Sequence, residues 1–347
     1  RRIHILKAVR IFAPGDIRVV DEPIQAVGKR QVLCKVEYVG ICGTDYGIYR
    51  GELEDMVNFP LRPGHEWSGT VYSVGEEVTL FKPGDRVIGE SLVTCDACID
   101  CIHADRKNCK NRKSVGTVDA WPGAMCEYEL FSEGDLIKLP DNISLEQGAL
   151  VEPAANAMMG IVNGNVGFGS TVAIMGTGPI GISAAAICRA YGARTVISVG
   201  RSDFKLDICK KLGATHTVNT NIEDTTEKIL QITGGEGVDV SIEVSGSKAL
   251  FESCIQSTKK FGDIEMIAFY EGTYPMDLTD FSFRGLTLRT AGCGGWGYFD
   301  RVIELMDQGL IDLTPMITHR CSLADAAEQI KNLKVDNAKK IKVMIEV

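Results

Sequence analysis

The sequence lacks any apolar run that approaches the roughly 20 residues required of a membrane-spanning helix. Its basic first residues are followed by an apolar stretch that is too short for a signal peptide. We therefore expect no membrane partner and a cytoplasmic location. Residues 1–6 are expected to form an extension ahead of a strand that begins near Lys7.

An excess of positive charge is also missing. The formal net charge is -9, because 46 Asp and Glu residues outnumber 37 Lys and Arg residues. A chain of this charge repels a phosphate backbone, so we expect no nucleic-acid partner. Biased tracts and internal repeats do not occur, and 45% hydrophobic residues is ordinary for a globular protein. The 347 residues suffice for about two domains of ~150 residues each.

Cysteine, by contrast, is abundant: there are 12, and four of them crowd into one short segment. This distribution favours metal binding and reduced buried thiols over a disulfide framework. Three cysteines two residues apart can surround one ion, and a fourth closes a tetrahedral thiolate site without an open position. We predict a structural zinc in a lobe at about 95–113; disulfides or a lobe of free thiols are the alternative. The predicted ligands are Cys95, Cys98, Cys101 and Cys109.

The first part of the chain, residues 7–139, consists of short apolar segments separated by turn residues. Residues 34–38 and 126–130 alternate between apolar and charged side chains, which is typical of half-buried strands. The pattern predicts a β-rich, partly closed barrel.

The second part begins with a predicted buried strand at 171–175, which runs into a glycine-rich turn, a helix and another strand at 195–199. That context is the one a dinucleotide-binding G-x-G-x-x-G motif requires. Its glycines let the backbone approach a pyrophosphate at the helix N-terminus. We predict a dinucleotide site here; the alternative is a turn that only packs. The candidate cofactor residues are Gly176, Gly178, Pro179, Ile180, Gly181, Gly200, Arg201, Ser202, Lys205 and Ser245.

Strands and helices continue to alternate toward the C-terminus. Repeated strand–helix units predict an α/β fold with a Rossmann doubly wound parallel sheet and helices on both faces. The predicted helices are 203–212, 248–259, 298–308 and 322–333, and the predicted strands are 238–244, 263–269, 286–290 and 340–347.

Three short segments supply a possible metal centre. Cys42 lies in residues 40–45, His65 and Glu66 follow a glycine, and Glu152 precedes a proline. One thiolate, one imidazole and carboxylates suit a zinc ion with one position open for water or substrate. Such an ion can act as a Lewis acid toward a bound oxygen. Cys42 as a protease-type nucleophile is the alternative, but no supporting triad is apparent.

Together, these motifs resemble the zinc-dependent medium-chain dehydrogenase/reductase family, in its alcohol, sorbitol and threonine dehydrogenase branch. The resemblance covers nearly the whole chain. It implies a GroES-like (chaperonin-10-like) catalytic domain at 1–154 and 292–347, and a Rossmann domain at 155–291. It also implies a homodimer or homotetramer.

The resemblance further implies roles at the metal centre. Cys42 and His65 would be zinc ligands, Glu66 a ligand or exchange partner, and Glu152 a ligand or a group bound through the zinc water. Asp45 would orient a ligand, or simply cap a helix.

The resemblance also gives Thr44 a role, in passing the alcohol proton onward, although it could merely pack. Many relatives carry a histidine five residues after the zinc cysteine, and this chain has Gly47 there. The proton path would therefore end in water, the ribose or another side chain. Candidate pocket walls, or ordinary core residues, are Tyr46, Tyr49, Phe59, Trp121 and Trp296.

The choice of nicotinamide cofactor depends on the end of the second Rossmann strand. Most NAD-binding units place Asp or Glu there, but this chain has Gly200 followed by Arg201. A guanidinium matches phosphate geometry, and Lys205 could add a second charge. We favour NADP(H), with NAD(H) as the alternative.

The expected function is zinc-dependent hydride transfer between a secondary alcohol and NADP(H) or NAD(H), with two zinc ions per chain. The expected substrate is a small polar alcohol or ketone, namely a polyol, sugar alcohol or cyclitol. One alternative is an amino-alcohol dehydrogenase of the threonine or aminocyclitol type. The other is a dinucleotide-binding protein without catalytic activity.

Overall fold

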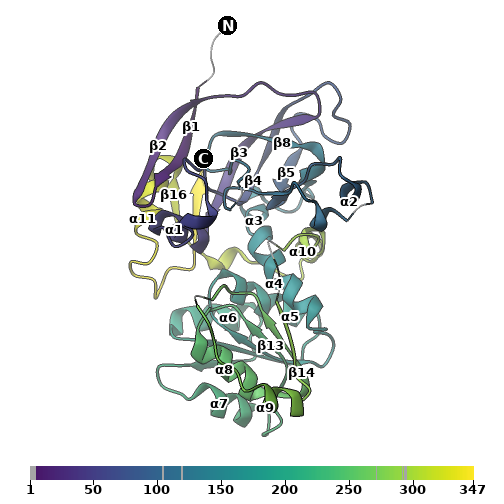
Figure 1. Ribbon diagram of the computed structural model, residues 1–347, viewed down its shortest axis with the longest axis vertical. Coiled ribbons are helices and arrows are strands. Elements are labelled where there is room, and N and C mark those ends of the chain that lie inside the picture. Colours follow the sequence, from purple (N-terminus) through teal and green to yellow (C-terminus); the bar gives the residue numbers. More distant parts are fainter. Residues whose placement is uncertain (1–4, 104, 119, 271, 291, 293–294) are drawn as a thin grey trace. The chain divides into compact units, whose positions relative to one another are not determined.

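The computed structural model describes residues 5–103, 105–118, 120–270, 272–290, 292 and 295–347. The chain divides into two compact units, Arg1–Glu152 with Ile317–Val347, and Pro153–Met316. Each unit is treated separately below (Figure 1).

The C-terminal boundary between the units differs from the expected one. Residues 292–316 were expected to belong with the first unit but group with the second. The reason is local packing: a Cβ at Gly295 would meet the backbone of Ala155, and the Tyr298 hydroxyl lies 3.3 Å from Asn163 Oδ1. These contacts tie the segment to helix α4 (Val151–Asn163).

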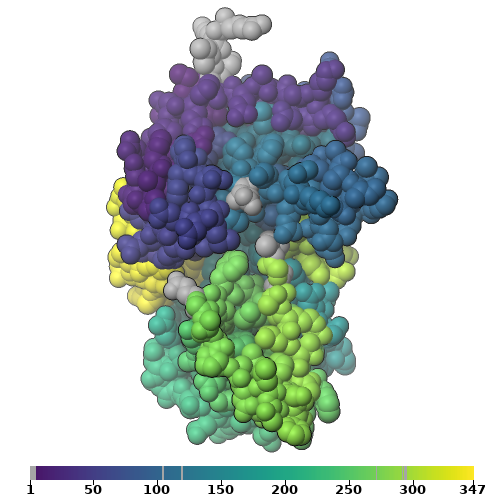
Figure 2. All heavy atoms as spheres, in the orientation of Figure 1, coloured from purple at the N-terminus to yellow at the C-terminus, as the bar shows by residue number. Residues whose placement is uncertain are grey.

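The first unit is built mainly of β-strands. A seven-stranded sheet has the order β16-β17-β3-β4-β5-β9, and β8 also pairs with β3. Its strands are β3 (Gln31–Ile41), β4 (Glu66–Val74), β5 (Arg86–Gly89), β8 (Tyr128–Ser132), β9 (Leu136–Lys138), β16 (Ile317–Ser322) and β17 (Lys342–Glu346). A separate hairpin pairs β1 (Ile5–Ala13) with β2 (Asp16–Pro23). The C-terminal residues, yellow in Figure 2, lie against the purple N-terminal segments.

Strand β3 is the centre of this unit. Val32, Cys34 and Val36 are fully buried while Lys35 is exposed, as the alternating pattern predicts. The core around β3 includes Trp67, whose ring stacks on that of Phe131 at a centroid distance of 4.7 Å. Burial of apolar surface on this scale fixes the register of the strand.

Short helices complete the first unit. They are α1 (Gly43–Arg50), α2 (Ile99–Ile102), α3 (Leu145–Gly148) and α11 (Ala326–Lys331). Helix α11 is shorter than the predicted helix at 322–333, because residues 323–325 form a 3-10 turn. Helix α2 belongs to the cysteine lobe, residues 95–113, which is enclosed by the paired strands β6 (Leu92–Val93) and β7 (Lys113–Ser114).

The second unit contains a six-stranded parallel sheet of order β12-β11-β10-β13-β14-β15. The strands are β10 (Thr171–Met175), β11 (Thr195–Gly200), β12 (His216–Asn219), β13 (Val238–Glu243), β14 (Thr258–Met266) and β15 (Thr287–Thr290). The remaining helices are α5 (Pro179–Ala190), α6 (Asp203–Leu212), α7 (Thr225–Ile232), α8 (Lys248–Ser257), α9 (Leu278–Phe283) and α10 (Phe299–Asp307). Helix α5 packs with α6, and α7 packs with α8.

This sheet has the predicted strand–helix alternation. Strand order reverses direction at β10 and β13, which places the glycine-rich turn after β10 at the switch point where such sheets bind ligands. Among the described residues, no helix is both long and apolar enough to cross a membrane.

Candidate metal centre and cofactor site

Cys42 lies where strand β3 passes into helix α1. It occupies the N-cap position, and its backbone N–H donates to Asp45 Oδ2 at 2.9 Å. Asp45 therefore does cap the helix, in the first turn where a negative charge is favourable. Its second oxygen, Oδ1, lies 3.9 Å from His65 Nδ1. Both atoms are buried and have no hydrogen-bond partner among the described residues.

His65 and Glu66 stand at the start of β4. The preceding Gly64 has φ +102, and a Cβ there would lie 2.7 Å from the Met125 side chain, so glycine is required for this close approach. The ligand atoms of Cys42, His65 and Glu66 lie within 4.8 Å of one another. With metal–ligand bonds of about 2.0–2.3 Å, a zinc ion fits among these donors.

Glu152 stands close to this centre but outside the group of mutually close ligand atoms. It is the second residue of α4 and is buried. Its negative charge contributes to the raised pKa of both His65 and Lys342. The structure thus brings Cys42, His65 and Glu66 together and leaves Glu152 beside them.

Acidic side chains outnumber basic ones at this centre. Burial lowers the pKa of His65, but the opposing effects of Cys42, Asp45 and Glu152 raise it well above its ordinary value. Burial also raises the pKa of Asp45, against the effect of His65. A buried cluster of anionic donors is stabilised by a cation, so the donor set fits a divalent metal ion.

Lys342 is a residue at this centre that the sequence analysis missed. It lies on β17, is only 1% exposed, and its Nζ donates to a Glu66 carboxylate oxygen and, at 3.2 Å, to the Ile41 carbonyl. Residues 340–347 were predicted as a strand, in which Lys342 shares a face with Met344 and Glu346. Nothing in that alternation marks the lysine as buried.

Thr44 and Gly47 lie on helix α1. Thr44 Oγ1 is 3.7 Å from Cys42 Sγ, so its hydroxyl is beside the candidate metal ligands. At Gly47, a Cβ would lie 3.1 Å from the carboxylate of Glu52. An acidic side chain therefore lies against the position at which the family resemblance led us to expect a histidine.

The four cysteines of the cysteine lobe also come together. Their sulfur atoms lie within 4.8 Å of one another, with Cys98–Cys101 and Cys95–Cys109 separations of 3.5 Å. A zinc tetrahedron with Zn–S bonds of about 2.3 Å has edges of about 3.8 Å. The described cysteines are free rather than disulfide-bonded. Backbone N–H groups of residues 97 and 98 lower the pKa of Cys95 to about 6, which favours the ligating thiolate.

The glycine-rich turn of the second unit has the geometry expected of a phosphate site. Gly176 has φ +127, and Pro179 opens helix α5 after the N-cap Gly178. No side chain in the described part of the chain caps this helix, and no described atom lies within 4 Å of a Cβ placed on Gly178. The first-turn N–H groups are thus available to an anion.

The end of β11 is shaped by a close contact within this turn. A Cβ at Gly200 would lie 2.5 Å from Thr177 Cγ2, so no side chain fits there without a shift. Arg201 is exposed, and Ser202 caps α6 by accepting from the Lys205 N–H at 3.4 Å. Arg201 and Lys205 therefore stand at the start of α6.

Ser245 follows β13 and is held by Glu243, a second residue that the sequence analysis missed. The Ser245 N–H donates to Glu243 at 2.8 Å, and the Gly246 N–H donates at 3.2 Å. Glu243 is fully buried. Its carboxylate fixes the loop at the switch point.

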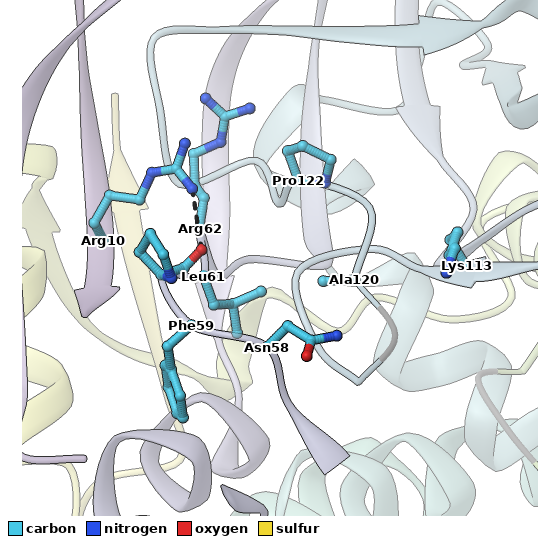
Figure 3. Close-up of a pocket in the computed structure, with 9 residues that line it drawn as sticks. Arg10, Asn58, Phe59, Leu61, Arg62, Lys113, Ala120 and Pro122 are labelled. Carbon is cyan, nitrogen blue, oxygen red and sulfur yellow. Dashed lines mark hydrogen bonds between the residues drawn. The ribbon is translucent and has the colours of Figure 1, made fainter. Parts of the chain in front are cut away.

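The predicted pocket walls lie mostly in the core. Tyr49, Phe59 and Trp121 pack, partly buried, against the apolar core of the first unit. Phe59 also lines a surface pocket of about 260 Å³, together with Arg10 and Arg62 (Figure 3). None of the candidate metal ligands lines this pocket, and we assign it no role in the reaction.

Two family models match parts of the chain. The chain matches a family model described as zinc-binding dehydrogenase over residues 179–308, and one described as alcohol dehydrogenase GroES-like domain over residues 28–141. It is 34% identical to an L-threonine 3-dehydrogenase of Edwardsiella ictaluri over 321 residues, 91% of this chain and 92% of that protein. Identity to the L-threonine 3-dehydrogenase of Bacillus velezensis is 35% over 309 residues, 87% and 88% of the two chains.

Solved structures give the same result. A putative zinc-binding dehydrogenase from Sinorhizobium meliloti, bound to NADP, superposes with a TM-score of 0.92 at 30% identity, covering 99% of this chain and 100% of that one. The 2R,3R-butanediol dehydrogenase from Bacillus subtilis superposes with a TM-score of 0.89 at 28% identity, covering 99% of each chain.

The fold, the cysteine–histidine–carboxylate centre and the glycine-rich turn define a two-domain, metal-dependent dehydrogenase. The chain belongs to the zinc-dependent medium-chain dehydrogenase family. It is an NAD(P)-dependent oxidoreductase that acts on a CH–OH group. The family, fold class and enzyme class predicted from the sequence are thereby confirmed.

Proposed function

We propose that this enzyme oxidises a polar secondary alcohol, namely a polyol, sugar alcohol or cyclitol, and reduces the matching ketone. The observation that carries the proposal is the carboxylate-bearing centre of Cys42, His65 and Glu66, whose ligand atoms lie within 4.8 Å of one another. We assign a catalytic zinc to this centre, with Glu152 as an additional ligand or a group bound through water. A structural zinc is assigned to the four cysteines of the cysteine lobe.

In the proposed reaction, zinc supplies Lewis-acid polarisation of the substrate oxygen, and the nicotinamide carries the hydride. The chain's own residues hold and orient these groups. Asp45 has one oxygen fixed by the Cys42 N–H, and its other oxygen lies 3.9 Å from His65 Nδ1, where a small movement of the ring would let the two groups hydrogen-bond and so orient the histidine. The Thr44 hydroxyl, beside Cys42, accepts the substrate proton and passes it on.

NADP(H) is the proposed cofactor, with NAD(H) as the alternative. Support comes from Gly200, whose closeness to Thr177 leaves no room for a carboxylate that would repel a 2′-phosphate. The exposed Arg201 and the nearby Lys205 supply positive charge, and the relative from Sinorhizobium meliloti was solved with NADP. Arg201→Ala should raise the KM for NADP⁺ selectively. Equal losses for NADP⁺ and NAD⁺ would refute the phosphate contact.

A second candidate substrate class is favoured by the relatives. Several proteins about 34% identical to this chain are named L-threonine 3-dehydrogenase, which supports an amino-alcohol substrate. Cofactor reduction should be assayed with polyols, cyclitols, aminocyclitols and L-threonine, each with and without a chelator. Chelator-sensitive turnover of polyols or cyclitols is expected. Turnover confined to amino alcohols would replace the polyol proposal, and no turnover of any alcohol by the zinc-loaded protein would refute both.

We also propose a homodimer or homotetramer. Strand β15 forms the edge of the six-stranded sheet, and Phe261 and Phe283 are both more than 80% exposed. An exposed edge and apolar side chains favour pairing with another chain. Sedimentation of the purified protein as a monomer at micromolar concentration would exclude this.

A further inference from the structure

The most deeply buried cation among the described residues of the first unit stands against a candidate metal ligand. Lys342 is 1% exposed, and its two hydrogen-bond acceptors are the Glu66 carboxylate and the Ile41 carbonyl. Withdrawing an ammonium from water is costly unless it is paired and hydrogen-bonded. The contact with Glu66 is therefore what allows a lysine to occupy this position.

The pairing depends on a gap in the side chains of β3. Gly40 is aligned with Glu66 of β4 on one side and with Met344 of β17 on the other. A Cβ at Gly40 would overlap Oε2 of Glu66. The absence of a side chain at Gly40 thus lets Glu66 lie over the strand and meet Lys342 from the opposite neighbour.

The same ammonium also contacts the backbone beside the thiolate ligand. Ile41, whose carbonyl accepts from Nζ at 3.2 Å, immediately precedes Cys42. The Lys342 ammonium is consequently linked to the side chain of Glu66 and, through the Ile41 carbonyl, to the backbone beside Cys42.

We propose that Lys342 is a positioning residue that holds the Glu66 carboxylate away from the catalytic metal and so keeps one coordination position free for substrate. A carboxylate oxygen bound to the ammonium must give up or share that bond before it can ligate a metal. Two arrangements follow, with Glu66 bound either to Lys342 or to the metal, and Lys342 favours the first. This inference rests on the proposed zinc at Cys42 and His65.

The effect of removing Lys342 on metal affinity distinguishes a positioning role from a purely structural one, because the two roles change the affinity in opposite directions. Removing a positive charge beside a dication, and releasing a carboxylate that can ligate it, both tighten metal binding. Loss of a structural support loosens the centre and weakens binding. The sign of the change in affinity therefore separates the two roles, independently of enzyme activity.

The test compares Lys342→Met with the parent protein, in the full-length chain. Zinc affinity is measured by competition with a chromogenic chelator, and the visible spectrum is recorded after cobalt(II) replaces zinc at the catalytic centre. We expect zinc to bind about tenfold more tightly, because a charge that repels the dication is removed, the cobalt spectrum to change toward higher coordination, and kcat to fall. Lys342→Arg should retain the parent affinity and spectrum.

A neighbouring lysine provides the matched control. Lys340 is 9% exposed and donates to the Asn332 carbonyl at 3.0 Å, away from the candidate ligands. Lys340→Met should leave zinc affinity and the cobalt spectrum unchanged. In a Glu66→Gln background, Lys342→Met should tighten zinc binding less than it does in the parent protein, because the released carboxylate is absent and only the effect of the removed charge remains.

Unchanged or weaker zinc binding by folded Lys342→Met would overturn the inference. If that variant fails to fold, Glu66→Gln alone decides. The inference expects an unchanged cobalt spectrum, whereas loss of an oxygen ligand would show that Glu66 already binds the metal. A separate control, Cys42→Ser, tests the metal centre itself. If this variant keeps the full zinc content and affinity, the proposed catalytic zinc fails, whatever the result at Lys342.

Discussion

Replacing Gly40 with alanine should damage the metal centre although it adds only one methyl group. The added Cβ would lie well under 3.0 Å from Oε2 of Glu66, so this carboxylate would have to move. A hydrogen bond to Lys342 tolerates a separation of only about 3.2 Å, so the shift breaks the ion pair. A buried charge without its partner costs about 3–5 kcal/mol. Replacing glycine in a strand returns about 0.5–1 kcal/mol. We expect a net loss of about 2–4 kcal/mol in the free energy of unfolding.

Chemical denaturation of the metal-free protein, followed by circular dichroism, measures this loss. Gly43→Ala is the matched control, because no described atom lies within 4 Å of a Cβ at that position. It should leave the free energy of unfolding within about 0.5 kcal/mol of the parent value. If Gly40→Ala is as stable as Gly43→Ala, the Lys342–Glu66 pair does not hold the sheet at this point and our account of it is wrong.

Three other changes test separate parts of the molecule. Cys98→Ser should remove the zinc ion of the cysteine lobe, measured by metal analysis, while the Cys42 centre stays loaded; an unchanged zinc content would contradict a four-thiolate site. Gly200→Asp should weaken both NADP⁺ and NAD⁺ in binding titrations, because the new side chain meets Thr177 at 2.5 Å; a clean switch to NAD⁺ would show that the contact yields easily. Burial raises the pKa of Glu265 to about 7. The folded state therefore binds more protons than the unfolded state between about pH 4.5 and 7, and the free energy of unfolding falls as pH rises through that window. Glu265→Gln should flatten this part of the stability profile, and an unchanged slope would contradict the assignment.

Local sequence signals predicted most of the second unit. The buried strand at 171–175, the glycine-rich turn and the following helix all lie where the pattern placed them. The pattern gave no prediction for β12, because its four residues are too few to show a period. It also gave none for helix α7, although that helix has an Asp224 cap and an amphipathic face.

The metal centre was only partly predictable, for a different reason. Cys42, His65 and Glu66 belong to short motifs with recognisable neighbours. Lys342 contacts Ile41 across 301 positions of sequence, through the docking of β17 on β3. No local pattern encodes such a pairing, and an alternating strand with lysine on one face reads as half-exposed. The position at which the chain returns to the first unit differs from the expected one for a similar reason. It depends on contacts between α4 and the segment that contains Gly295, which are distant in sequence.

The balance of charge connects the metal, the lysine and the glycine. Cys42, Asp45, Glu66 and Glu152 offer four acidic groups, of which the three carboxyl groups are buried and the thiol is partly buried, against the cation of Lys342 and a histidine. One ammonium cannot neutralise this set, and each unpaired buried charge is destabilising. The proposed dication at Cys42 and His65 would offset most of the excess, while Lys342 compensates Glu66 separately. With that metal bound, the centre would divide its acidic groups between two cations, and Gly40 provides the space in which Glu66 can reach the second one.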